Sequence, residues 1–155
     1  MTSAEALRAV ELLASRPLVR LVTEIDDNGA IPPRRLAATL PDLSTHQLRS
    51  ASDTARAHGL IRITPGAGLE LTQAGTELAD LYDAMARWAR LHAVPAPVCE
   101  FSSRIQCVLD LLAPSLTTER PDGAEAGLAR LRTLLNRWLA DNSQVARVSE
   151  PGPVA

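Results

Sequence analysis

Arginine and small polar side chains between residues 34 and 62 carry the chemistry of most interest in this sequence. A guanidinium group can pair bidentately with phosphate oxygens or with a guanine edge, and hydroxyl and imidazole groups can hydrogen-bond the same surfaces. The candidates are Arg34, Arg35, Thr45, His46, Arg49, Ser50 and Arg62. Residues 30–62 hold five arginines and two acids, a local excess of three positive charges in a chain of formal net charge −2. The hypothesis is a phosphate- and base-contacting surface, and the alternative is an ordinary solvated face.

No pattern in the sequence is typical of a catalytic or metal site. The histidines His46, His58 and His92 lie too far apart for metal-ligand spacing, and there is no glycine-rich phosphate loop or Gly-x-Ser-x-Gly motif. Cys99 and Cys107 do not form a disulfide framework, so we expect reduced thiols, with an intersubunit disulfide as the alternative. We therefore expect a protein that is not an enzyme and uses no cofactor or metal.

The polar candidates between residues 45 and 50 need a helix to present them. Ser44 followed by Gln47 has the spacing of a capping box, which predicts a helix from about 44 to 57. Its inward face would be formed by Leu48, Ala51 and Ala55. The opposite face would then present Thr45, His46, Arg49 and Ser50.

The remaining elements are predicted from apolar periodicity, caps and chain-breaking residues. Helices are expected over residues 3–15, 18–27, 33–40, 72–92, 98–112 and 123–140. Two strands, 60–64 and 69–71, flank the turn Pro65-Gly66-Ala67-Gly68 and form a β-hairpin. The expected fold class is mainly α, a winged helix-turn-helix with a two-stranded β-wing and a C-terminal helical extension for dimerisation.

Three long helices predicted after the hairpin carry apolar stripes that need a partner, and the first two supply the candidate interface residues. These residues are Leu78, Leu81, Tyr82, Met85, Trp88, Phe101, Ile105 and Val108. They can form either the core of one chain or a dimer interface, and we expect the interface because a small winged-helix domain cannot cover three long amphipathic helices. The aromatic residues Tyr82, Trp88, Phe101 and Trp138 are candidates for packing or, alternatively, for a small-molecule effector pocket.

Four segments carry a family resemblance, and they are Ala9–Leu13, Leu36–Ser44, His58–Ile61 and Leu69–Gly75. In their order and spacing the chain resembles the winged-helix regulators of bacteria, most closely the HxlR family and more distantly the MarR family. The last segment is similar to the Leu-Thr-x-x-Gly run that closes the wing of such proteins. The chain departs from the HxlR pattern in having no cysteine before its first helix and a shorter, less basic wing.

The resemblance implies a homodimer that presents two recognition helices to double-stranded DNA. We expect a winged-helix DNA-binding domain (1–93), a helical dimerisation region (98–141) and a disordered tail (142–155), which has no apolar stripe. The expected function is transcription regulation with helix 44–57 in the major groove. One alternative is a winged-helix protein-interaction module that does not read DNA. Another is a fragment of a small-molecule O-methyltransferase, whose dimerisation domain is similar.

We expect a cytoplasmic location and no membrane segment. No run of about 18 uncharged apolar residues occurs, which is the length a membrane-spanning helix needs. The first eleven residues carry Glu5, Arg8 and Glu11 and have no apolar stretch, so they do not have the pattern of a secretory signal.

Overall fold

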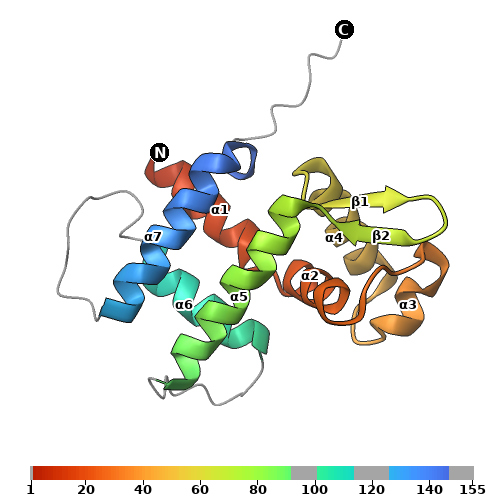
Figure 1. Ribbon diagram of the computed structural model, residues 1–155, viewed down its shortest axis with the longest axis horizontal. Coiled ribbons are helices and arrows are strands. Elements are labelled where there is room, and N and C mark those ends of the chain that lie inside the picture. Colours follow the sequence, from red (N-terminus) through yellow and green to blue (C-terminus); the bar gives the residue numbers. More distant parts are fainter. Residues whose placement is uncertain (1, 92–100, 114–125, 147–155) are drawn as a thin grey trace, which may run out of the picture.

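The computed structural model describes residues 2–91, 101–113 and 126–146 and is mainly helical, with one two-stranded antiparallel sheet (Figure 1). The predicted mainly-α fold class is therefore confirmed. The elements are α1 (Ser3–Leu13), α2 (Arg16–Asn28), η1 (Pro33–Arg35), α3 (Leu36–Thr39), α4 (Thr45–Ala57), β1 (Ile61–Thr64), β2 (Gly68–Leu71), α5 (Gln73–Leu91), α6 (Phe101–Leu112), α7 (Ala126–Asp141) and η3 (Ser143–Val145).

Helix α5 runs through the middle of the molecule and packs against elements on both sides. In Figure 1, α2, α3, α4 and the β1–β2 hairpin lie on one side of α5, α7 lies on the other, and α6 crosses behind it. Contacts of α5 with α2, α6 and α7 join both sides to it. A single apolar core cluster extends from α1 to η3, so the described parts of the predicted regions 1–93 and 98–141 share one core.

Local signals in the sequence explain where α4 begins and which face it buries. The Ser44 hydroxyl accepts a hydrogen bond from the Gln47 backbone N–H (3.1 Å), and the Gln47 side chain accepts one from the Ser44 N–H (2.9 Å). The predicted capping box is thus confirmed. Its predicted inward residues, Leu48, Ala51 and Ala55, are buried.

A third segment joins the predicted hairpin. The β1–β2 ladder pairs Ile61 with Leu71 at one end and Thr64 with Gly68 at the other. Ile31 then forms an isolated bridge with Leu69 on the free edge of β2, through reciprocal backbone hydrogen bonds of 3.1 and 2.8 Å. Because Ile31 precedes a proline, its backbone is biased towards the extended conformation that this bridge requires.

Two elements differ from the prediction. The predicted helix 33–40 begins as a 3-10 turn (η1) and has only one turn of α-helix (α3), where Pro33 opens the segment and Pro41 ends it. The tail predicted as disordered from residue 142 is wrong for residues 142–146, because η3 folds back and buries Val145 and Ala146. The remainder of that tail lies outside the described residues.

Three long-range hydrogen bonds tie the two ends of the chain to its middle. The buried Tyr82 hydroxyl donates to the Leu13 carbonyl (2.6 Å), at the end of α1. The Trp138 indole N–H donates to the Ala74 carbonyl (3.1 Å), and the Gln144 amide donates to the His58 carbonyl (3.0 Å), directly after α4. None of the helices described is both long and apolar enough to cross a bilayer.

Candidate nucleic-acid interface

The outward face of α4 is polar and uncovered. Thr45, His46, Arg49 and Ser50 are all exposed, as the sequence predicted, because Leu48 and Ala51 turn the opposite face into the core. The Arg49 guanidinium makes no ion pair or hydrogen bond to any residue in the described ranges. These four side chains are therefore available to an external partner.

A hollow of about 270 Å³ lies between α4 and the junction of α1 with α2. His46 and Ser50 line it from α4, and Ser15 and Pro17 line it from the junction. Thr45 and Arg49 are not among its lining residues. Of the four candidates on α4, two therefore border this hollow and two lie outside it.

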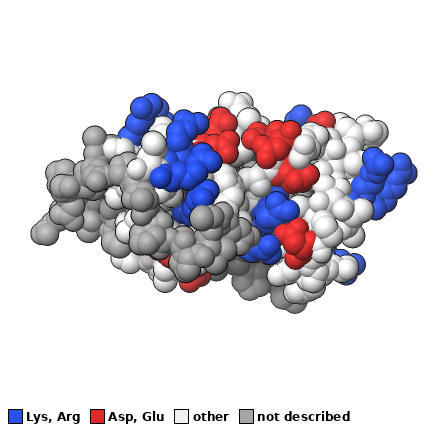
Figure 2. Space-filling model, turned by 90° about the horizontal axis from the view of Figure 1, so that it is seen from below, with Lys and Arg blue, Asp and Glu red and all other residues white. Residues whose placement is uncertain are grey.

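Arg34 and Arg35 lie in η1 and are exposed. Figure 2 shows arginine side chains at the end of the molecule that carries α3 and the hairpin, with acidic side chains gathered nearer the middle of that face. Neither guanidinium is paired with another residue of the described chain. Their charge is thus available for phosphate oxygens.

Arg62, on β1, is only partly available. Its side chain is 65% exposed, but its Nε lies 3.7 Å from an Oε2 atom of Glu70, its cross-strand partner. The Thr64 hydroxyl donates a 2.7 Å hydrogen bond to the same carboxylate oxygen. Glu70 therefore offsets part of the positive charge that the sequence predicted for this hairpin.

An ion-pair network around Asp42 was missed by the sequence analysis. Arg20 binds the Asp42 carboxylate bidentately with two 3.0 Å hydrogen bonds, and Arg16 adds a third at 2.9 Å. The hydrogen bonds from Arg20, assisted by both positive charges, lower the pKa of Asp42 to about 2. The arginines lie four residues apart on α2, a spacing that places both on one helix face and was the available signal.

This network changes the charge balance that the sequence implied. Asp42 was counted as one of two acids opposing the five arginines of residues 30–62. Because Arg16 and Arg20 both bind it, its negative charge is compensated from outside that segment. The network also fastens the turn before α4 to α2, so it holds the exposed helix in place.

Acidic residues of α2 and α5 form a separate surface. Burial and mutual repulsion with Asp27 and Asp80 raise the pKa of Asp26, and burial with repulsion from the same neighbours raises the pKa of Asp83. A surface on which carboxylates already repel one another is unfavourable for a phosphate backbone.

The residues predicted for a dimer interface form the core of a single chain. Six of them are buried, and they are Leu78, Leu81, Tyr82, Met85, Ile105 and Val108. Trp88 and Phe101 are half-buried and pack against the same cluster. The prediction that these side chains face a partner is wrong for the six buried ones, because α6 and α7 fold back over α5 and cover its apolar stripe.

The described part of the chain offers few groups for metal binding or thiol chemistry. Within residues 2–91, 101–113 and 126–146, no three His, Cys, Asp or Glu side chains are placed to hold a metal ion. Cys107 is half-buried with a free thiol, whereas Cys99 and His92 lie outside the described residues.

Comparisons with known protein families, with curated proteins and with solved structures found no significant match to this chain.

Proposed function

We propose that this chain is a winged-helix transcriptional regulator that inserts α4 into the major groove of double-stranded DNA. The observation that carries the proposal is the uncovered polar face of α4, a capped helix of 13 residues whose other face is buried. A helix presented in this way fits the major groove, where side chains reach base edges. The β1–β2 hairpin would serve as the wing beside it.

The exposed arginines divide into two roles in this proposal. Arg49 projects from the middle of the free face, where its guanidinium can bind a guanine edge bidentately. Arg34, Arg35 and the partly paired Arg62 would contact phosphates on either side of the groove. The Asp42 network supports these contacts by holding the turn that precedes α4.

We also propose that the protein acts as a cytoplasmic homodimer, so that two recognition helices reach successive turns of the duplex. Its interface must use surface outside the α5–α6 core, because that core is already covered within one chain. Exposed large apolar side chains available for it are Leu7 on α1, Leu91 at the end of α5 and Leu111 on α6.

DNA binding is tested by fluorescence anisotropy with a labelled duplex from the region upstream of the gene, at several salt concentrations. We expect Arg49→Ala to weaken binding by roughly 10- to 100-fold and to relax base preference at one position, since a bidentate base contact contributes about 1–3 kcal/mol. Arg34→Ala should weaken binding to all sequences and reduce the salt slope by about one.

The matched control is Arg8→Ala, which removes an exposed arginine from α1. It should leave the affinity and the salt slope close to those of the unmodified protein. No binding at low salt would contradict the proposal, and so would binding that the Arg49 and Arg34 variants leave unchanged.

A protein-interaction module is the second candidate, and the hairpin supplies the observation that favours it. Glu70 offsets Arg62, and Ile63 on the same strand is 48% exposed. A neutralised hairpin with an exposed apolar side chain suits a protein surface better than a phosphate backbone. Stoichiometric co-purification of a protein, with no affinity for DNA at low salt, would favour this function over the first.

A further inference from the structure

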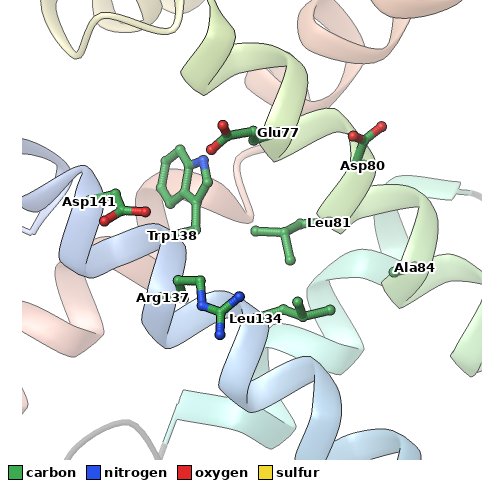
Figure 3. A pocket seen from close by; sticks show the side chains of 8 residues that line it. All are labelled: Glu77, Asp80, Leu81, Ala84, Leu134, Arg137, Trp138 and Asp141. Atoms are coloured by element: carbon green, nitrogen blue, oxygen red, sulfur yellow. The ribbon is translucent and has the colours of Figure 1, made fainter.

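A groove between α5 and α7 lies apart from the proposed DNA-contacting residues and has its own chemistry (Figure 3). It encloses about 240 Å³. Its floor is apolar and is formed by Leu81 of α5 and by Leu134 and Trp138 of α7. Charged side chains of both helices stand around this floor. An apolar floor with a charged rim is the usual form of a small-molecule site.

The Trp138 indole is held in a fixed position. Its N–H donates to the Ala74 carbonyl (3.1 Å), and the residue is 3% exposed. In Figure 3 the ring stands between the carboxylates of Glu77 and Asp141. The ring is thus almost wholly buried, and a ligand entering the groove would meet mainly the two carboxylates beside it.

The charges around the floor are unequal. Three carboxylates, those of Glu77, Asp80 and Asp141, line the groove with a single guanidinium, that of Arg137. None of these four side chains forms an ion pair with another residue in the part of the chain described. Glu77 accepts one hydrogen bond, from the Gln73 amide (3.1 Å). The groove thus has two uncompensated negative charges beside an aromatic ring.

From this arrangement we infer that the α5–α7 groove binds a small organic cation, an ammonium group on an apolar or aromatic body. The carboxylates would neutralise the ammonium through charge-assisted hydrogen bonds. The apolar body would cover Leu81 and Leu134. The enclosed volume lies below that of pockets for drug-sized ligands, so the ligand is of the size of an arylalkylamine.

Helix α7 also connects this groove to α4. After Asp141 the chain enters η3, where the Gln144 amide donates to the carbonyl of His58, the residue that ends α4. A ligand that shifts α7 against α5 therefore acts on the anchor of α4. This regulatory consequence rests on the proposed DNA-binding function, whereas binding of the cation does not.

Binding is tested by isothermal calorimetry of the full chain with benzylammonium, using benzyl alcohol and benzoate as neutral and anionic probes of the same shape. We expect benzylammonium to bind and the other two to bind at least tenfold more weakly. Glu77→Gln and Asp141→Asn should each weaken binding roughly fivefold, the factor that corresponds to about 1 kcal/mol of lost ion pairing. Asp110→Asn, on the exposed side of α6, is the matched control and should change nothing.

Several outcomes would overturn the inference. Equal binding of benzyl alcohol would remove the role of the carboxylates, and preferred binding of benzoate would reverse the assigned charge. Absence of benzylammonium binding, or equal weakening by Asp110→Asn, would exclude this groove as a cation site. Thermal unfolding of each variant verifies that it is folded, so that lost binding reports on the groove.

The coupling to α4 is tested separately by repeating the DNA anisotropy titration with saturating benzylammonium. We expect a shift in DNA affinity that Glu77→Gln with Asp141→Asn removes. If the protein binds no DNA, the proposed function fails while the calorimetric result still decides the cation site. If DNA binds and benzylammonium binds without affecting it, the coupling through Gln144 is wrong.

Discussion

Asp42 helps to position the free face of α4, although it lies outside that helix. Its carboxylate lies in the turn before α4 and accepts hydrogen bonds from Arg16 and Arg20 of α2. The bidentate pair of hydrogen bonds with Arg20 fixes both the distance and the relative orientation of the two side chains, whereas a single hydrogen bond fixes mainly the distance. The angle at which α4 presents its free face therefore depends partly on this carboxylate.

We predict that Asp42→Asn lowers the free energy of unfolding by about 1 kcal/mol, the upper range for a solvent-accessible ion pair, because two arginines lose their shared partner. The effect depends on pH. The pKa of Asp42 is about 2 in the folded protein, below its ordinary value of 3.8. The unfolded chain therefore binds the proton first, and the stabilisation is present above pH 3.8 and lost as the pH falls towards 2.

Urea unfolding of the two proteins between pH 7 and pH 2 measures this difference. Asp53→Asn, an exposed acid on α4, is the matched control and should show no comparable loss at pH 7. A difference between Asp42→Asn and the unmodified protein that stays constant down to pH 2 would contradict the assigned pKa.

At the scale of elements, the hairpin depends on a close approach between two backbones. Gly68 begins β2 with φ +107°, and a Cβ atom there would overlap the carbonyl of Ile31 and the Cα atom of Pro32. The adjacent Leu69 exchanges two hydrogen bonds with Ile31. Glycine is therefore required at position 68 both for its conformation and for the space beside it.

We predict that Gly68→Ala destabilises the protein by about 2 kcal/mol or more, since the strain of a positive φ adds to the overlap with Ile31. Gly66→Ala is the matched control, because Gly66 also has a positive φ (+83°) but open space around it. The Gly66→Ala variant should lose only about 1 kcal/mol of its free energy of unfolding. Urea unfolding measures both, and hydrogen exchange of the Leu69 amide reports on the bridge. Equal losses in the two variants would contradict the close approach.

At the scale of the whole molecule, α5 joins the proposed DNA-binding part to the C-terminal helices in one core. Leu78 and Met85 of α5 belong to the same buried cluster as Leu48 of α4 and Leu135 of α7. Two parts that share a core cannot unfold separately without exposing apolar surface. The C-terminal helices therefore contribute to the stability of the part that carries α4.

We predict a single cooperative unfolding transition, in which far-UV circular dichroism and tryptophan fluorescence give the same midpoint. Leu135→Ala should lower the free energy of unfolding by about 2–4 kcal/mol, because Leu135 is fully buried in α7. Gln106→Ala, at an exposed position on α6, is the control and should have little effect. Two separated transitions would show that the halves are independent.

Much of the secondary structure could be predicted because its signals are local. The Ser44–Gln47 box, the turn at Gly66 and the apolar spacing of α5 each act over a few residues, and the structure reproduces them within a few positions. The exposure of Arg49 followed from the same periodicity. The bridge of Ile31 to β2 could not be predicted, because its partner lies 38 positions further along the chain.

By itself, the sequence determined which face of each helix is apolar and which side chains of α4 are left free. Periodicity and capping are properties of a single element, so they need no knowledge of its neighbours. What covers the apolar stripe of α5 became clear from the fold alone, because the covering helices α6 and α7 belong to the same chain and not to a partner. The fold also determined which charges are paired, as at Asp42 and Arg62, because burial and ion pairing depend on contacts between residues distant in sequence.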